Sequence, residues 1–398
     1  MSSPSLPVET LDNIVDHLHD TRDALKSCCL VSKSWISRTR THLFSHVTFD
    51  IPEKLRSWKT SFPDPSTSPA HYTRSLFIVL PQTITPADAR QGGWIPSFSH
   101  VAYFSASDSG MGDADRSFIL FHGFSPAIRS LQLTFTVVSL SRTLDLIVSF
   151  PLLEDFSVIA LAIANDVVSD RSILPSKTPV FTGTLQLHSQ TGMRHIASQL
   201  LSLPSGLHFR QLKLTWASGE DIPLTAALIE RCHLALEHLD IGFGLISTSV
   251  QCLCPHQWLT SFVENPSFKS IDLSKVKNLK EVTFSCKLGL EWIVTTLQTI
   301  TRNHKTFQRI SLDTSSTLYY FIPANPSGNI NDREWLELDR TLCQLLESHS
   351  IRLGVLCDAP MFHEEIEAEN RARSSLASLL PLVTGRGIVD LIRLDSRR

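Results

Sequence analysis

The chain has 398 residues, of which 42% are hydrophobic and 19% are charged, and its formal net charge is −3. This length allows two or three domains, or one small domain followed by a long repeat array. Because the charge is nearly balanced, it excludes the strong field of one sign that is typical of nucleic-acid and membrane-surface binders, and we expect neither kind of partner.

The first residues and the cysteines indicate where the protein works. The first five residues carry no basic segment before an apolar run, so we expect no secretory signal. No stretch approaches the roughly 18 apolar residues that a membrane-spanning helix needs. The eight cysteines are spread thinly and two are adjacent (Cys28 and Cys29), which favours reduced thiols over a disulfide framework. Cytoplasm or nucleus is therefore the expected location.

Three short helices are predicted within residues 1–50. Pro7 suits the first turn of the first helix, because its missing N–H has no intrahelical partner to lose. Apolar residues then follow at the spacing of one buried helical face: Leu11, Ile14, Val15 and Leu18. Asp20 or Thr21 can cap a second helix, and Ser32 can cap a third. Helices of this number and size bury too little surface to be stable alone, so we expect them to pack against a partner or the next domain.

The same segment resembles the F-box over about forty positions. The match consists of the Leu-Pro start, the apolar helical positions after it, and a Val-x-Lys-x-Trp signature; Ser32 departs from the Cys that the family often has there. In that family the segment docks on a Skp-type adaptor, which links it to a cullin–RING ubiquitin ligase. The resemblance implies an adaptor-binding set made of Leu6, Pro7, Leu11, Ile14, Leu18, Leu25, Val31, Lys33 and Trp35. Trp35 is equally suited to holding the helices together.

Residues 51–72 are predicted to form a linker or loop, because Ser61–Ala70 is rich in Pro and Ser. Beyond it, over residues 73–398, the pattern apolar-x-x-apolar-x-apolar recurs. Full copies begin at Phe98, Ile128, Leu153, Phe209, Leu236, Phe268, Leu279 and Phe307, and weaker copies begin at Thr73 and Thr182. Successive copies from 98 to 236 begin 25 to 30 residues apart, near the leucine-rich-repeat period of roughly 20–29 residues. Between 236 and 307 the register stays open, since the copies at 268 and 279 both fit.

Helix-like stretches lie between these predicted strands, at 144–150, 193–203, 224–232, 288–302 and 341–349. Strand followed by helix, repeated, predicts a leucine-rich-repeat-like α/β solenoid, with a curved parallel sheet, outer helices and a C-terminal cap. The whole chain is thus expected to be α+β, and it resembles fungal F-box proteins with degenerate leucine-rich repeats. The Asn or Cys that normally follows the strand of such repeats is missing, and alternating strands and helices also suit a doubly wound sheet.

Motifs for metal binding or catalysis fall short of the spacing that their chemistry needs. Cys252-Leu-Cys254-Pro-His256, with Cys232 and His233 upstream, lacks the second paired knuckle of a zinc site. Three other segments nearly match known motifs. The segment at Gly123 lacks the closing glycine of a nucleophile elbow, and the segment at His363 lacks the second histidine of a zinc-protease helix. The segment at Asp108 lacks the closing glutamate of an EF-hand. The sequence therefore predicts no metal, no cofactor and no enzyme activity.

These predictions combine into a substrate-recognition adaptor of a Skp–cullin–F-box ubiquitin ligase. The F-box is expected to bind the Skp-type adaptor, and through it a cullin–RING ligase, while the repeats bind an unknown target protein. Strand positions that alternate with the buried set are expected to face that target: Gln132, Thr134, Lys213, Thr215, Asp240 and Gly242. Two alternatives stay open: an F-box scaffold outside ubiquitination and, from another class, an enzyme built on an α/β sheet.

Overall fold

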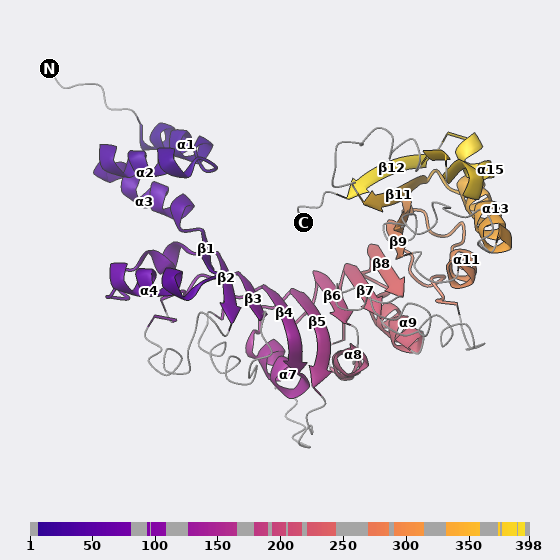
Figure 1. Cartoon of the computed structure of the whole chain (residues 1–398), viewed down its shortest axis with the longest axis horizontal. Coiled ribbons are helices and arrows are strands. Elements are labelled where there is room, and N and C mark those ends of the chain that lie inside the picture. Colours follow the sequence, from indigo (N-terminus) through magenta and orange to yellow (C-terminus); the bar gives the residue numbers. More distant parts are fainter. Residues whose placement is uncertain are drawn as a thin grey trace, which may run out of the picture. The chain divides into compact units, whose positions relative to one another are not determined.

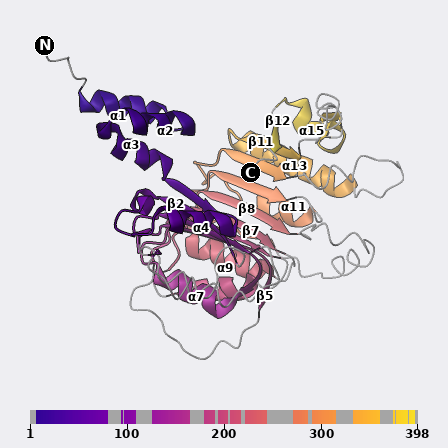
Figure 2. The ribbon, with the colours of Figure 1, turned by 60° about the vertical axis from the view of Figure 1, so that its left-hand side comes forward.

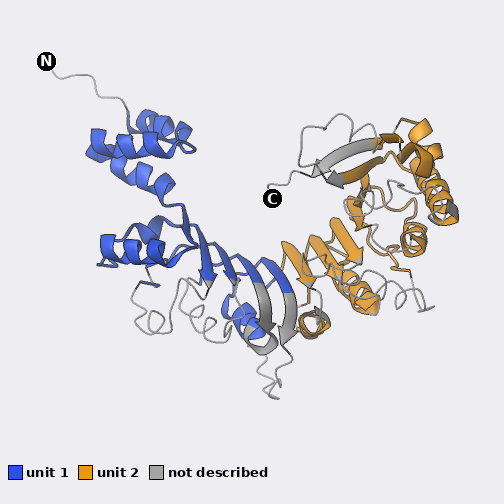
Figure 3. Cartoon of the chain, in the orientation of Figure 1, with its two compact units in different colours: residues 1–180 blue, residues 181–398 orange. Residues whose placement is uncertain are grey.

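A computed structural model of the whole chain describes residues 7–80, 94–95, 97–108, 126–164, 179–189, 193–203, 206–216, 221–243, 270–285, 290–313, 332–358, 373–374, 376–387 and 389–394. The chain divides into two compact units, unit 1 (Met1–Val180) and unit 2 (Phe181–Arg398), coloured separately in Figure 3. Each unit is built on parallel strands that follow one another in chain order (Figure 1).

Unit 1 begins with three helices, α1 (Val8–His17), α2 (Arg22–Val31) and α3 (Lys33–Leu43), so the three predicted helices are confirmed. They lie side by side in Figure 2. Pro7 precedes the first turn of α1, where its carbonyl accepts hydrogen bonds from the N–H groups of Thr10 and Leu11 at 3.0 and 3.2 Å. Ser32 caps α3, because its hydroxyl accepts a hydrogen bond from the N–H of Ser34 at 3.3 Å.

The parallel sheet of unit 1 runs through β1 (His46–Phe49), β2 (Ser75–Leu80), β3 (Tyr103–Asp108), β4 (Ser130–Ser139) and β5 (Asp155–Ala164). α7 (Leu140–Ser149) joins β4 to β5. The strand register places one buried apolar residue of each strand opposite the next: Val47, Leu76, Phe104, Leu131 and Phe156. The repeated apolar pattern of the sequence is therefore the interior row of this sheet.

The segment expected to be a linker is folded. It holds α4 (Pro52–Ser61) and the short 3-10 helix η1 (Pro69–Tyr72), and Leu55 of α4 is buried. The sheet also begins earlier than expected, since β1 starts at His46 inside residues 1–50. Of the prolines that suggested a loop, Pro63 and Pro65 lie in the non-helical stretch between α4 and η1. Pro69 stands in the first turn of η1, a position that proline tolerates well.

Unit 2 alternates strands with helices: β6 (Thr184–Ser189), α8 (Met193–Ser202), β7 (Gln211–Trp216), α9 (Ile222–Cys232), β8 (His238–Phe243), β9 (Glu281–Ser285), α11 (Glu291–Leu297), β10 (Arg309–Asp313), α13 (Asp332–Ser348), β11 (Arg352–Asp358), α15 (Pro381–Gly385) and β12 (Val389–Leu394). All strand pairs in this unit are parallel. A second buried row crosses them, formed by Leu185, Leu212, Leu239, Val282, Ile310 and Leu353.

The open register between 236 and 307 is settled by β9, which belongs to the copy that begins at Leu279. Residues 270–280 form no strand, although Ile271 and Leu273 are buried. Their N–H groups donate to the hydroxyls of Thr296 and Thr299 at 3.2 and 2.9 Å, so they are satisfied without a sheet partner. Phe268 itself lies outside the described residues.

Both units have the strand order of an α/β solenoid, because the described strands pair only with their neighbours in the chain. A doubly wound sheet would instead place later strands on both sides of the first one. The predicted solenoid of leucine-rich-repeat type is therefore the fold of the repeats, and the doubly wound alternative is wrong for the described strands.

Candidate docking surface on the N-terminal helices

The three N-terminal helices expose several large apolar side chains. The exposed fractions are 63% for Val8, 41% for Ile14, 89% for Leu30 and 70% for Val31. We call these four residues the exposed apolar set. Single exposed apolar side chains are ordinary on protein surfaces, and these four stand on the first two helices of a three-helix bundle.

The residues of the predicted adaptor-binding set fall into three groups. Pro7, Ile14, Val31 and Lys33 are exposed, whereas Leu11, Leu18 and Trp35 are half-buried, and Leu6 lies outside the described residues. Leu25 has only 1% of its surface exposed. Its side chain packs inside the bundle, so the assignment of Leu25 to direct contact needs correction: Leu25 holds the helices together.

Val8 and Leu30 are additions that the sequence pattern did not assign to the site. Val8 occupies a position where the motif accepts any residue. Leu30 follows the buried Leu25 by five residues, which turns it about 140° away around α2 at 100° per residue. A helical wheel drawn from Leu25 and Cys28 would have placed Leu30 on the outward side.

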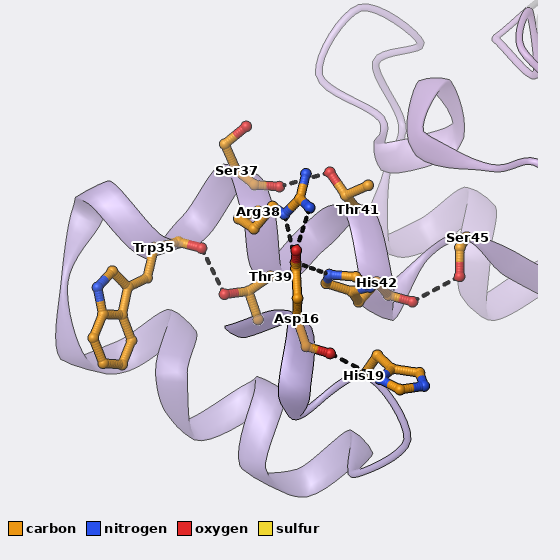
Figure 4. Close-up of polar contacts among 9 residues, drawn as sticks. All are labelled: Asp16, His19, Trp35, Ser37, Arg38, Thr39, Thr41, His42 and Ser45. Carbon is orange, nitrogen blue, oxygen red and sulfur yellow. Dashed lines mark hydrogen bonds and ion pairs between the residues drawn. The ribbon is translucent and has the colours of Figure 1, made fainter. Parts of the chain in front are cut away.

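An ion-pair network fixes α1 against α3 (Figure 4). Nε and Nη2 of Arg38 donate to the two carboxylate oxygens of Asp16 at 2.6 and 2.5 Å, and Nε2 of His42 lies 2.8 Å from Oδ1 of Asp16. The buried Thr39 hydroxyl donates to the carbonyl of Trp35 at 2.5 Å. A bidentate pair of this kind fixes both distance and orientation. The network therefore holds α1, which carries Val8 and Ile14, against α3.

Replacing Asp16 with asparagine should loosen the bundle. Hydrogen bonds from Arg38 and His42 hold the pKa of Asp16 well below its ordinary value. Since the folded state lowers this pKa, the ionised carboxylate adds stability that is present above about pH 4 and lost as the pH falls below it. Hydrogen exchange of residues 8–43, followed from pH 7 downwards, should show the variant less protected than the wild type at pH 7 and still less protected at pH 3.5. The difference should shrink only as the pH falls further, toward the lowered pKa of Asp16.

Asp23→Asn is the matched control for that measurement. The pKa of Asp23 is also lowered, by a hydrogen bond from Lys26, but both residues belong to α2 and their contact joins no two helices. Equal protection in the two variants at pH 7 would show that the Asp16 network does not hold the bundle.

An aromatic cluster connects these helices to the first strands of the repeats. Phe44, directly after α3, makes edge-to-face contacts with Trp58 and Phe62 at centroid distances of 5.9 and 6.0 Å. Trp58 in turn contacts Phe49 of β1 at 5.7 Å and Phe98 at 5.6 Å. The N-terminal helices are therefore attached to the sheet of unit 1 through a packed core.

The polar strand positions expected to face a target alternate with the buried rows. Gln132 is exposed, and Thr134, Lys213, Thr215 and Asp240 are half-buried. Gly242 is buried, and a Cβ added to it would lie 3.0 Å from the Cβ of Ser285, which leaves little room for a side chain. Apart from Gly242, these positions carry side chains that alternate with the buried rows and keep part of their surface exposed.

The metal and catalytic near-matches lie mostly outside the described residues, which is the case for Cys252, Cys254, His256, Gly123 and His363. Cys232 is described: it is buried in α9, and burial raises the pKa of its thiol to about 12. Among the described residues, no group of three or more His, Cys, Asp or Glu side chains is placed to hold a metal ion. No helix within the described part of the chain is long and apolar enough to cross a membrane.

No family model matches this chain, and no curated protein matches it. Among solved structures, the chain is similar to the crystal structure of the leucine-rich repeat-containing protein LegL7 from Legionella pneumophila. The TM-score is 0.40 and the sequence identity is 10%, over 88% of this chain and 91% of that chain. The fold assignment rests on the strand order and register of the two units.

Proposed function

We propose that this chain is the substrate receptor of a Skp–cullin–F-box ubiquitin ligase. Its N-terminal helices bind a Skp-type adaptor, and its repeats bind the protein to be ubiquitinated. The observation that carries the proposal is the exposed apolar set on a three-helix bundle whose sequence resembles the F-box. In this role the chain performs no chemistry itself; it raises the effective concentration of the target near the ligase.

The energetics of the bundle support a partner at this surface. Fully burying a Leu or Val side chain contributes about 1.5–3 kcal/mol, and Leu30 and Val31 are left mostly in water. Lys33 follows Val31 by two residues and is exposed, so a charged group is close to these apolar side chains in the chain. An apolar centre with a polar rim is the usual build of a protein–protein interface.

The test is co-purification of the full chain with a Skp-type adaptor. A double variant, Leu30→Ala with Val31→Ala, should weaken binding by about 100-fold, because it removes two apolar contacts worth about 3 kcal/mol together. Leu234→Ala is the matched control, since Leu234 is 71% exposed but belongs to unit 2. It should bind the adaptor like the wild type.

The outcomes separate the alternatives. Failure of the wild-type chain to bind the adaptor, under conditions where known F-boxes do, would overturn the proposal. Adaptor binding without recruitment of a cullin would favour a scaffold that acts outside ubiquitination. Equal adaptor binding by the double variant and the Leu234 control would show that the docking surface does not include the end of α2.

A further inference from the structure

The polar face of unit 2 brings charged side chains of neighbouring strands together. The register aligns Lys213, Asp240 and Thr283 in one row across β7, β8 and β9. The adjacent row, two residues further along each strand, aligns Gly242 with Ser285 and Ser285 with Asp313. Because side chains alternate along a strand, both rows lie on the face opposite the buried Phe284. Helix α11 covers that other face, where its Trp292 contacts Phe284 at a centroid distance of 5.4 Å.

Asp240 is the carboxylate on this face that lacks a fixed partner. It is half-buried, and it has no hydrogen bond or ion pair with any residue that the structure describes. Burial and the nearby charge of Asp313 raise the pKa of Asp240 to about 6, against the opposing effect of Lys213. An ionised carboxylate placed this way reduces the stability of the fold, which is typical of residues held for binding.

Glu281, on the neighbouring strand β9, has the side-chain partners that Asp240 lacks among the described residues. Its carboxylate lies 3.6 Å from Nδ1 of His238 and 3.9 Å from Nη1 of Arg309, and it accepts a hydrogen bond from the Ser311 hydroxyl at 3.4 Å. Glu281 therefore has Arg309, the His238 ring and the Ser311 hydroxyl close to its carboxylate. The carboxylate of Asp240 receives no such contacts within the described part of unit 2.

A second polar group points to a missing partner at the same place. Ser285 is only 8% exposed, and its buried hydroxyl has no hydrogen-bond partner among the described residues. Its side chain lies beside Gly242, since a Cβ on that glycine would come within 3.0 Å of the Ser285 Cβ and 3.6 Å of its hydroxyl. A buried hydroxyl left unpaired costs free energy, and a ligand that donates a hydrogen bond would recover it.

We propose that Asp240, Ser285 and Asp313 form a recognition site for a single basic side chain, Arg or Lys, of the target protein. The proposal deepens the proposed function, because it names the chemistry of the target that the repeats bind. The ligand's cation would neutralise Asp240 and donate to the Ser285 hydroxyl, and Asp313 adds negative charge from β10. Lys213 and Arg309 flank the site and repel a run of positive charges, so the recognised segment carries one basic residue at this point and not a basic cluster.

The experiment selects random dodecapeptides displayed on phage against the immobilised full chain. Against the wild type, the selected peptides should share one enriched Arg or Lys position. Against Asp240→Asn that enrichment should disappear. Glu291→Gln, which removes a negative charge from the exposed side of α11, should keep it. No selected peptides, no enriched basic position, or enrichment that persists with Asp240→Asn would each overturn the proposal.

Affinity measurements on one selected peptide make the test quantitative. Asp240→Asn should weaken binding at least about tenfold, and Ser285→Ala should weaken it by a smaller factor. Replacing the basic residue of the peptide with Gln should weaken its binding to the wild type by the same factor as Asp240→Asn does. It should not weaken binding to the Asp240→Asn variant any further. Asp240→Asn should also raise the melting temperature, because it removes a half-buried charge without a partner; a lower melting temperature would identify Asp240 as a structural residue.

The readouts of the two proposals are independent. Asp240→Asn lies in unit 2 and should leave adaptor co-purification unchanged, whereas the double variant at Leu30 and Val31 should leave peptide selection unchanged. Failure of adaptor binding with intact peptide selection would overturn the ligase role alone. Adaptor binding without an enriched Arg or Lys position in the selected peptides would overturn the recognition site alone.

Discussion

Replacing Asp339 with alanine should destabilise the C-terminal part of unit 2 by about 2–4 kcal/mol. Asp339 is fully buried in α13, and its carboxylate oxygens accept hydrogen bonds from the N–H groups of Leu382 and Val383 at 2.8 and 3.0 Å. These N–H groups belong to the first turn of α15, where they have no intrahelical acceptor. Alanine would leave both donors unpaired and lose the only side-chain bonds that the structure describes between α13 and this turn.

Hydrogen exchange of the segments that hold α15 and β12 would measure this loss. Asp339→Asn is the control, because its amide keeps one acceptor oxygen and should lose about half as much protection. Unchanged exchange in the alanine variant would mean that the turn at Leu382 and Val383 is held by other contacts.

Replacing Phe49 with alanine should cost about 3–5 kcal/mol in unit 1, the range for deleting a buried aromatic side chain. Phe49 is buried at the end of β1 and makes edge-to-face contacts with Trp58, Trp94 and Phe98 at centroid distances of 5.7, 6.1 and 6.2 Å. Each such pair adds to the free energy of area burial. Because the same cluster attaches α3 to the sheet, the variant should also free the N-terminal helices from the repeats.

Urea unfolding followed by tryptophan fluorescence would give the change in stability, and hydrogen exchange of residues 46–62 would locate it. Phe49→Leu keeps an apolar side chain in the site and should cost clearly less, about 1–2 kcal/mol. Equal losses for alanine and leucine would mean that the aromatic contacts, and not the filled volume, stabilise the junction.

Much of the fold follows from the sequence because its signals are local. The spacing of Leu11, Ile14, Val15 and Leu18 predicted α1, although Ile14 is exposed and not buried as that spacing implied. Ser32 predicted the start of α3. The repeated apolar pattern predicted β4 and its buried Leu131, since one strand position in two must face the core. Strand order followed from the repeat, because each unit can bury its apolar face only against its neighbours.

What escaped prediction depends on contacts between residues far apart in the chain. The composition of Ser61–Ala70 suggested a loop over residues 51–72, and only the burial of Leu55 within unit 1 shows why α4 forms. Leu25 matched the docking motif, yet its burial depends on how α2 packs on α3. The Asp339 cap joins segments whose meeting no local pattern encodes, and no local pattern shows that the Ser285 hydroxyl is buried without a partner among the described residues.

The pairing of strands in chain order has a consequence for how the protein can be altered. The sequence between β7 and β8 runs from Trp216 to His238, whereas that between β8 and β9 runs from Phe243 to Glu281, yet both pairs are parallel and in continuous register. The length of a connection is therefore independent of the pairing that it spans, and each doubling of a loop adds only about 0.6 kcal/mol of closure entropy. An epitope or a fluorescent domain inserted after β8 and ahead of the buried Ile271 should leave the sheet intact, which gives the repeats a position for labels and for new binding segments.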